Sequence, residues 1–248
     1  MKRFVQRNIL DPARKGQLLR TLRFLPAVYA QWKKYVSLSS ERVRLSDWFV
    51  QLNDATKTTP FDPHYFYQSA WLARKIAQHP PRKHVDVASQ IDMIAPLSAF
   101  VDIEFVDLRP LEATLPRLKC VKGSILNLPY AAMSVGSISS LHVVEHIGLG
   151  RYGDPLDVDG CKKACAEMQR VLAIGGNLYL STPIGQERVE FNAHRVYSPL
   201  TIGRYFNALD LVSFSIVDDE GNYTDNATIA AYSNLSYGLG LFHFTRCG

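Results

Sequence analysis

The chain has 248 residues, of which 47% are hydrophobic and 21% are charged, and its formal net charge at pH 7 is +5. This length and composition suffice for one hydrophobic core with an appended segment, and no run of about 18 apolar residues indicates a membrane-spanning helix. The four cysteines form no CxxC pair and the first residues lack the apolar stretch of a secretory signal, so we expect a cytoplasmic protein with reduced thiols.

The N-terminal segment carries the positive charge of the chain. Residues 1–60 hold 12 Lys and Arg against 4 Asp and Glu, whereas the rest of the chain holds 16 against 19. Pro26 predicts a kink or a division into two short helices. Apolar side chains on one helix face predict an amphipathic helix, and they are Leu18, Leu22, Leu25, Tyr29, Trp32 and Val36.

Residues 1–58 are therefore predicted to form a basic helical extension. One interpretation is a cap that packs on the rest of the chain or on a second subunit, as in a homodimer. The alternative is that residues 14–36 form a peripheral contact with an anionic membrane or hold a lipid-linked substrate. No nucleic-acid partner is expected, because the segment lacks the interleaved aromatic and basic residues that stack bases.

Residues 59–248 are predicted to form an α/β domain. Strand patterns alternate with helical patterns, which predicts a doubly wound, mostly parallel sheet of seven strands with an antiparallel last strand. Gly175 and Gly176 are expected to end the helix that begins at Gly160. The predicted strands are 83–88, 101–110, 118–123, 137–144, 177–183, 211–223 and 238–247, and the predicted helices are 65–78, 89–100, 160–172 and 198–209.

The ends of the first two strands offer candidate cofactor ligands. Asp86, Ala88 and Ser89 follow the first strand, where close approach of a ligand to the backbone usually needs glycine. Two small residues keep such binding open, and the alternative is an ordinary strand–helix turn. Asp107 ends the second strand, where a carboxylate can accept hydrogen bonds from a ribose diol or can pair with Arg109.

The fourth strand runs into the pattern HxxEH, formed by His142, Glu145 and His146. An inverted zincin motif needs a long helix, which the glycines that follow do not favour. A divalent-cation site made by the three side chains stays open. We favour a role for His146 as the base that takes a proton from a substrate hydroxyl, because histidine titrates near neutrality. The alternative is a histidine in the core or at a helix cap.

Two polar loops near this edge are candidate substrate sites. The glycine-rich loop GLGRYGDP carries Arg151 and Tyr152, and a guanidinium can clamp a phosphate or a carboxylate. A second loop follows the fifth strand, and the sheet model places it beside His146. We expect this loop to contact a polar substrate, the alternative being hydrogen bonds that anchor the loop. Its candidate residues are Asn192, His194, Arg195 and Tyr197.

Several stretches together resemble the class I S-adenosylmethionine-dependent methyltransferases. They are GSILNLPY, SLHVVEHIG, EMQRVLAIGGNLYLSTP and HRVYSP, and the resemblance extends from about Lys83 to the C-terminus. More narrowly, LHVVEHIGLGRYGDP and EFNAHRVYSP resemble a poorly characterised methyltransferase-like branch, some members of which are linked to bacterial surface-polysaccharide loci. The resemblance implies a Rossmann-like fold and S-adenosyl-L-methionine as the cofactor.

The resemblance also implies roles for individual residues. Asp86, Ala88 and Ser89 would border the methionine part of the cofactor, and Asp107 would hold the ribose. Ser124 and Ile125 would flank the adenine, and His142 would lie beneath the sulfonium. The positions of His142, Glu145 and His146 match a divalent-ion site of the ubiquinone-type enzymes, although a histidine here replaces the first acid.

The function expected from the resemblance is O-methylation of a polar acceptor, either a sugar or a phosphorylated glycan intermediate, with His146, His194 and Glu145 as catalytic residues. The chain departs from the family pattern in two places, because the first loop lacks glycine and Ser124 stands where an acid is usual. The alternative is therefore a catalytically inactive binding or scaffold protein that acts through its basic N-terminal helices.

Overall fold

The computed structural model describes residues 15–51 and 54–248, with side chains from residue 24 onward. The chain divides into two compact units between Pro60 and Phe61. Within the described residues, none of the helices combines the length and the apolar character needed to cross a membrane.

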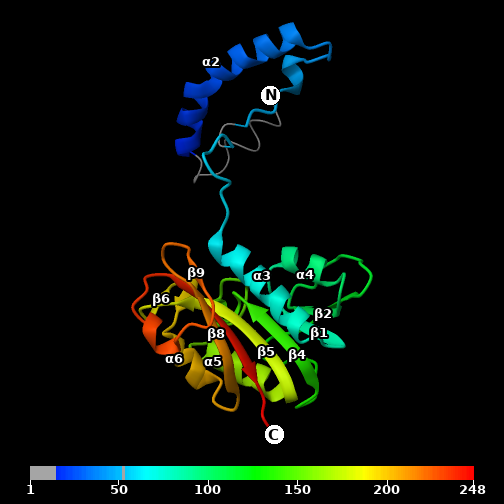
Figure 1. Cartoon of the computed structure of the whole chain (residues 1–248), viewed down its shortest axis with the longest axis vertical. Coiled ribbons are helices and arrows are strands. Elements are labelled where there is room, and N and C mark those ends of the chain that lie inside the picture. Colours follow the sequence, from blue (N-terminus) through cyan, green and yellow to red (C-terminus); the bar gives the residue numbers. More distant parts are fainter. Residues whose placement is uncertain (1–14, 52–53) are drawn as a thin grey trace. The chain divides into compact units, whose positions relative to one another are not determined.

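The first unit contains one long helix, α2 (Lys15–Leu38), and a short 3-10 helix, η2 (Leu45–Asp47). α2 continues through Pro26, so the alternative of two short helices is wrong, and the helix bends along its course (Figure 1). The rings of Trp32 and Trp48 pack 5.6 Å apart. The side chains of Leu18 and Leu22, and residue 14 of the predicted membrane-contact segment, lie outside the described residues.

The second unit is built on one mixed sheet with the strand order β3-β2-β1-β4-β5-β10-β8-β9. Neighbours from β3 to β5 are parallel, whereas β10 is antiparallel to both β5 and β8. The predicted α/β fold is confirmed, but the predicted number of seven strands is wrong. The described sheet has eight, because the two-residue β9 adds to the edge at β8. The strands of this sheet are β1 (Lys83–Val87), β2 (Asp102–Asp107), β3 (Leu118–Lys122), β4 (Val135–Leu141), β5 (Leu172–Ile184), β8 (Asp210–Val217), β9 (Tyr223–Thr224) and β10 (Gly238–Thr245).

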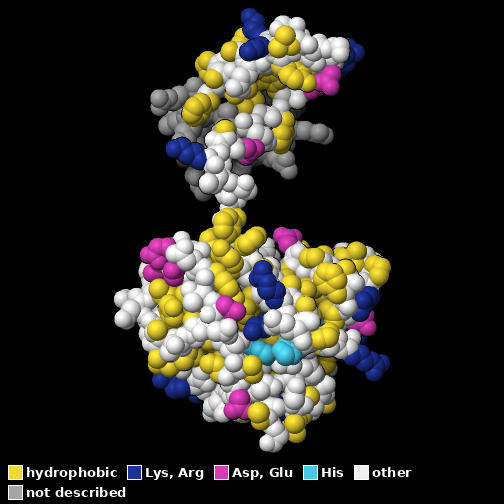
Figure 2. All heavy atoms as spheres, viewed as in Figure 1, with side chains coloured by type: hydrophobic (Ala, Val, Ile, Leu, Met, Phe, Trp, Pro, Cys, Tyr) yellow, Lys and Arg dark blue, Asp and Glu magenta, His cyan; other side chains and the backbone are white. Residues whose placement is uncertain are grey.

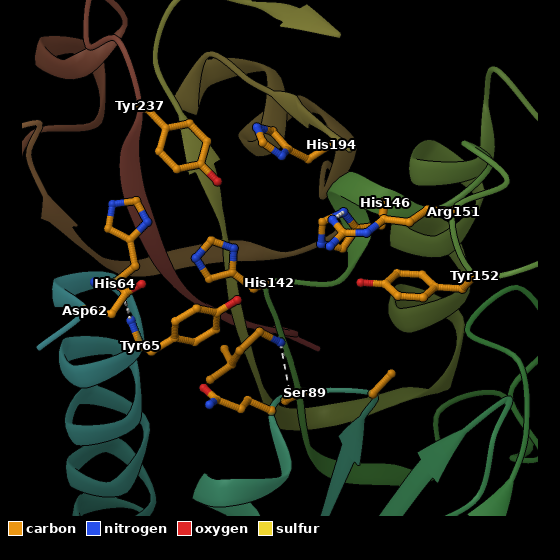
Figure 3. Close-up of a pocket in the computed structure, with 13 residues that line it drawn as sticks. Asp62, His64, Tyr65, Ser89, His142, His146, Arg151, Tyr152, His194 and Tyr237 are labelled. Atoms are coloured by element: carbon orange, nitrogen blue, oxygen red, sulfur yellow. Dashed lines mark hydrogen bonds between the residues drawn. The ribbon is translucent and has the colours of Figure 1, made fainter. Parts of the chain in front are cut away.

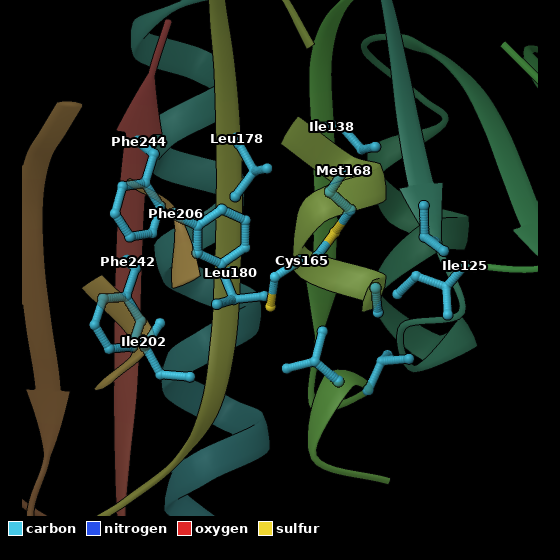
Figure 4. Packing of buried hydrophobic residues seen from close by; sticks show 14 of the residues in the cluster. Ile125, Ile138, Cys165, Met168, Leu178, Leu180, Ile202, Phe206, Phe242 and Phe244 are labelled. Carbon is cyan, nitrogen blue, oxygen red and sulfur yellow. The ribbon is translucent and has the colours of Figure 1, made fainter. Parts of the chain in front are cut away.

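Helices cover both faces of this sheet, and a separate pair of short strands lies beside it (Figure 1). Buried side chains of α5 and α6 share one hydrophobic cluster with one face, and those of α3 and α4 share a second cluster with the other. Alternate residues of β10 feed the two clusters, with Phe242 and Phe244 in the first (Figure 4) and Leu241 in the second. The remaining elements are α3 (Pro63–Gln78), α4 (Ile91–Leu97), η3 (Val144–His146), α5 (Gly160–Val171), β6 (Arg188–Glu190), β7 (His194–Val196), α6 (Pro199–Tyr205) and η4 (Ile229–Tyr232).

The expected helix end at the glycine pair is wrong. α5 ends at Val171, and both Gly175 and Gly176 lie inside β5. Gly175 has a φ of 72°, and its N–H donates to the carbonyl oxygen of Arg246 at 2.8 Å. The register between β4 and β5 shifts in this region. The glycines therefore accommodate an irregularity in a strand, because glycine adopts a positive φ without strain.

Candidate functional site

The turn after β1 takes the backbone path of a glycine without having one. Ala88 has a φ of 58°, in the left-handed region that glycine enters freely and that costs an alanine about 1–2 kcal/mol. Its N–H donates to the carbonyl oxygen of Val106 at 2.9 Å. The first loop lacks the glycine that the family pattern has, but the backbone still turns here as it would at a glycine.

A buried network below this turn holds it in place. The carboxylate of Asp86 accepts hydrogen bonds from the N–H of Ser89 at 3.1 Å, from the hydroxyl of Ser89 at 2.7 Å and from the hydroxyl of Ser139. Since Ser139 donates to Asp86, its oxygen accepts from Nε2 of His84, at 2.8 Å. Burial raises the pKa of Asp86 to about 6 and lowers that of His84 to about 3. We call His84, Ser139, Asp86 and Ser89 the buried network.

The turn after β4 also begins with a residue at positive φ, His142 at 56°. Its Nδ1 lies 2.7 Å from Oε1 of Glu145, whose side chain is completely buried. Among the described residues, Nε2 of His142 and Oε2 of Glu145 are buried without a hydrogen-bond partner. Buried polar atoms are rarely left so, which marks this turn as a functional candidate.

The predicted metal site is not formed by these residues. No group of three or more His, Cys, Asp and Glu side chains is arranged to hold a metal ion within the part of the chain that the structure describes. His142 and Glu145 bind each other, and Nε2 of His146 lies 3.8 Å from the same Oε1 of Glu145. Both histidines therefore face the same oxygen of Glu145, and His142 already occupies it.

His146 has the tautomer that a general base needs. Its Nδ1 lies 2.7 Å from the carbonyl oxygen of Ala193, which can only accept, and 3.3 Å from Nη1 of Arg151, which can only donate. The shorter contact requires the proton on Nδ1, which leaves the lone pair on Nε2. Nη1 of Arg151 donates to the same carbonyl oxygen at 3.0 Å. Burial lowers the pKa of His146, which keeps the ring neutral at pH 7. The predicted base thus has an accepting nitrogen in a half-buried setting.

A polar pocket of about 600 Å³ lies at this edge of the sheet (Figure 3). Histidine and tyrosine side chains dominate its wall, and they come from α3, from the turn after β4 and the loop that follows it, from β7 and from the segment before β10. We call this cavity the polar pocket. Its lining is Asp62, His64, Tyr65, Ala88, Ser89, Gln90, Leu141, His142, His146, Arg151, Tyr152, His194 and Tyr237.

Sequence reasoning missed one wall of the polar pocket. The ring of His64 stacks on His142 at 5.6 Å and on Tyr237 at 5.4 Å, with interplanar angles of 18° and 21°. Burial, with the neighbouring His142, lowers the pKa of His64 to about 4, so the ring of His64 is uncharged at pH 7. The available signal was Asp62-Pro63, an N-cap residue followed by proline, which fixes the helix start beside these rings.

A smaller pocket of about 130 Å³ adjoins the polar pocket. Ala88, His142, His146 and Tyr152 line both cavities. The ring of Tyr152 lies between the guanidinium groups of Arg109, at 5.0 Å, and Arg151, at 5.1 Å. We call this cavity the small pocket, and its other lining residues are Val87, Val106, Asp107, Leu108, Arg109, Gly123, Ile125, Val143 and Ile147.

The predicted cofactor residues divide between the pockets and the interior. Asp107 and Ile125 line the small pocket, whereas Ser124 does not, and its hydroxyl oxygen accepts from the N–H of Leu126 at 3.2 Å. Oδ1 of Asp107 accepts from the N–H of Arg109 at 2.7 Å. Asp86 lines neither cavity and acts from below through the buried network.

The predicted substrate loop is brought to the site only in part. His194 lines the polar pocket, with Nε2 at 3.0 Å from Oε2 of Glu190. Arg195 is buried and donates to the carbonyl oxygen of Ile147 at 2.7 Å, so it anchors the loop after η3. Tyr197 is buried in the core and Asn192 is exposed, and neither lines the polar pocket or the cavity that contains Asp107 and Ile125. The alternative expectation of loop-anchoring hydrogen bonds describes Arg195 correctly.

Comparisons with known proteins give a fold and little more. A family model described as a Caenorhabditis protein of unknown function, DUF268, matches residues 127–234. No curated protein matches the chain. The N-methyltransferase NodS from Bradyrhizobium japonicum is similar in structure, with a TM-score of 0.54 and 15% identity over 75% of this chain and 98% of that chain. Its complex with S-adenosyl-L-homocysteine gives a TM-score of 0.52 and 12% identity over 74% and 87%.

A second similar structure is YcgJ from Bacillus subtilis, with a TM-score of 0.52 and 13% identity over 74% of this chain and 99% of that chain. The similarity is confined to the arrangement of helices and strands, because the identities are low. The chain therefore has the fold of the S-adenosylmethionine-dependent methyltransferases. One fold can support many different reactions, so the function depends on the residues of the site.

Proposed function

We propose that this protein is an S-adenosylmethionine-dependent methyltransferase that acts on an oxygen of a polar acceptor, either a sugar or a phosphorylated glycan intermediate. One observation carries the proposal. His146 lines both the small pocket and the polar pocket, and the carbonyl oxygen of Ala193 fixes the tautomer in which Nε2 is the acceptor. A base at the junction of two cavities suits a reaction between two bound molecules.

The residues of the small pocket fit the nucleoside end of the proposed cofactor, and its methionine end would extend past Ala88 into the polar pocket. Ala88 supports a close backbone approach, Ile125 and Leu108 offer apolar surface to a base, and Asp107 offers a carboxylate to a ribose. A Cβ at Gly123 would lie 2.7 Å from Cγ1 of Val106, so a larger residue at this position would require Val106 to shift. When bound, S-adenosylmethionine would supply its sulfonium methyl group: the bond from this methyl to sulfur breaks, a bond to the acceptor oxygen forms, and S-adenosylhomocysteine is the second product.

The chain's own residues do the rest. The rings of His64, Tyr65 and Tyr237 hold the acceptor in the polar pocket, where correct positioning lowers the barrier by up to roughly 7–11 kcal/mol. Nε2 of His146 takes the proton of the acceptor hydroxyl as the new bond to oxygen forms, and later releases it to water. Glu145, at 3.8 Å from this nitrogen, stabilises the imidazolium that results.

Calorimetric titration with S-adenosylmethionine and S-adenosylhomocysteine, with and without magnesium, tests the proposal. We expect micromolar binding that does not require magnesium. Asp107→Ala should weaken binding at least tenfold, because a hydrogen bond to a charged group contributes about 1.5–3 kcal/mol. Asp102→Ala is the matched control, since Asp102 lies at the other end of β2 and pairs with Arg117 at 2.7 Å. Absence of binding would contradict the proposal and favour a non-catalytic protein of this fold.

A further inference from the structure

A third cavity, of about 580 Å³, lies between α3 and α4. Small residues on one face of α3, Ser69, Ala70 and Ala73, line its floor, because their spacing places them on the same side of the helix. The rings of Phe66 and Phe100 stand at its walls. We call this cavity the apolar groove.

The apolar groove is unusually hydrophobic for an open surface. Phe61, Phe66 and Phe100 are 54%, 57% and 70% exposed. Figure 2 shows hydrophobic side chains gathered on the side of the second unit where α3 begins and α4 lies. Contiguous exposed apolar surface of this kind marks a binding site more often than a free surface.

The apolar groove and the polar pocket are neighbours. Asp62, Tyr65 and Gln90 line both cavities, so the two cavities adjoin at these side chains. The carboxylate of Asp62 caps α3, accepting from the N–H groups of His64 at 2.9 Å and Tyr65 at 3.3 Å. No Lys or Arg lines the apolar groove, so this cavity does not suit an anionic group.

We propose that the acceptor is an amphiphile whose polar head lies in the polar pocket and whose hydrocarbon chain lies in the apolar groove. The occupant of the groove is thus a chain covalently joined to the molecule that reaches His146. This inference rests on the proposed function only in making the head the methyl acceptor. The binding of the chain depends on the two adjoining cavities alone.

A series of alkyl glucosides, titrated into the full-length protein, tests the inference. Glucose and its hexyl, octyl and decyl β-glucosides are titrated calorimetrically below their micelle concentrations, with geranyl glucoside as an isoprenoid arm. We expect the affinity to rise about fourfold for each methylene until the groove is filled, because each buried CH₂ contributes a fixed increment. Tighter binding of the geranyl compound than of decyl glucoside would identify an isoprenoid chain. Equal affinities across the whole series would overturn the inference.

Two variants locate the chain within the apolar groove. Ala70→Phe fills the floor and should abolish the dependence on chain length, whereas Ala77→Phe, two turns further along α3 and exposed, should leave it unchanged. Phe100→Ser removes an exposed ring without disturbing the core and should weaken the longer glucosides. Persistence of the full dependence in both Ala70→Phe and Phe100→Ser would overturn the inference, because the chain would then bind elsewhere.

S-adenosylhomocysteine binding, measured on the same proteins, separates this inference from the proposed function. Ala70 lines neither the small pocket nor the polar pocket, so Ala70→Phe should bind S-adenosylhomocysteine as the unmodified protein does. If S-adenosylhomocysteine binds and alkyl chain length has no effect on affinity, the acceptor is not an amphiphile and the proposed methyltransferase activity is unaffected. If affinity depends on alkyl chain length and S-adenosylhomocysteine does not bind, the protein has a site for an amphiphile but does not carry out the proposed reaction.

Discussion

The turns that follow β1 and β4 have the same backbone bend and opposite chemistry. Each places a non-glycine residue in the left-handed region, Ala88 at a φ of 58° and His142 at 56°. Below Ala88, the carboxylate of Asp86 has hydrogen-bond donors on both of its oxygens. Beside His142, the carboxylate of Glu145 has a partner on one oxygen and, among the described residues, none on the other.

This difference shows how strain at a sheet edge can serve two purposes. The β1 turn is supported from the interior, and the polar groups of its network satisfy one another. The β4 turn leaves polar atoms of His142 and Glu145 without partners next to the polar pocket, which costs stability unless a ligand contributes. We infer that the first turn mainly maintains the shape of the site and that the second turn carries the reaction.

Replacement of His146, which follows the β4 turn, should have the largest effect of the variants considered for the two turns. His146→Ala should lower turnover by about 10²–10⁴-fold, because the acceptor hydroxyl loses its base. Affinity for S-adenosylhomocysteine should change little, since the small pocket keeps Asp107 and Ile125. Single-turnover formation of S-adenosylhomocysteine measures the rate, and His79→Ala, an exposed histidine at the end of α3, is the control. Normal turnover in His146→Ala would remove this residue from the mechanism.

The replacement Asp86→Asn in the β1 turn should have a smaller effect than His146→Ala. This effect should appear in the pH dependence of stability and not in the reaction rate. The folded-state pKa of Asp86, about 6, lies above its ordinary value of 3.8. Its contribution to stability is therefore fully present below about pH 3.8 and is lost as the pH rises through about 6. The free energy of unfolding of the wild type relative to Asp86→Asn should increase by about 2 kcal/mol between pH 7 and pH 4.

Urea unfolding, followed by far-ultraviolet circular dichroism, measures this difference. His84, with its pKa lowered to about 3, works in the opposite direction, because the unfolded chain takes up its proton first as the pH falls. This contribution is common to both proteins and cancels in the comparison. A difference that does not change with pH would mean that Asp86 is ionised throughout, contrary to the structural role inferred for the β1 turn.

The sequence predicts the part of the site that depends on strand order. Asp107, Ile125 and His146 come together because the carboxyl ends of parallel strands share one edge of the sheet. The amphipathic and strand periodicities likewise predict most of the elements that build this edge. The fold and one side of the site are therefore accessible from periodicity and strand ends alone.

The rest of the site depends on packing between segments that are distant in the chain. His64 and Tyr237 are separated by most of the second unit and stack only in the folded state. Arg195 has the residue type of a substrate ligand, but its donors reach backbone carbonyls in the interior. The two-residue β9 and the irregularity at Gly175 arise from pairing with neighbouring strands, which a single segment does not encode.

Replacement of Ala88 by glycine should have the smallest effect, and it tests whether the β1 turn is strained. Gly at this position relieves the left-handed strain that the buried network now holds in place, so Ala88→Gly should stabilise the protein by about 0.5–1 kcal/mol. The control is Ala95→Gly in α4, where the same change in a helix should cost about 1 kcal/mol. Urea unfolding of both variants measures the two effects, and opposite signs are the expected result. Equal destabilisation would mean that the Ala88 turn is not strained, and the β1 turn would then need no network to hold it.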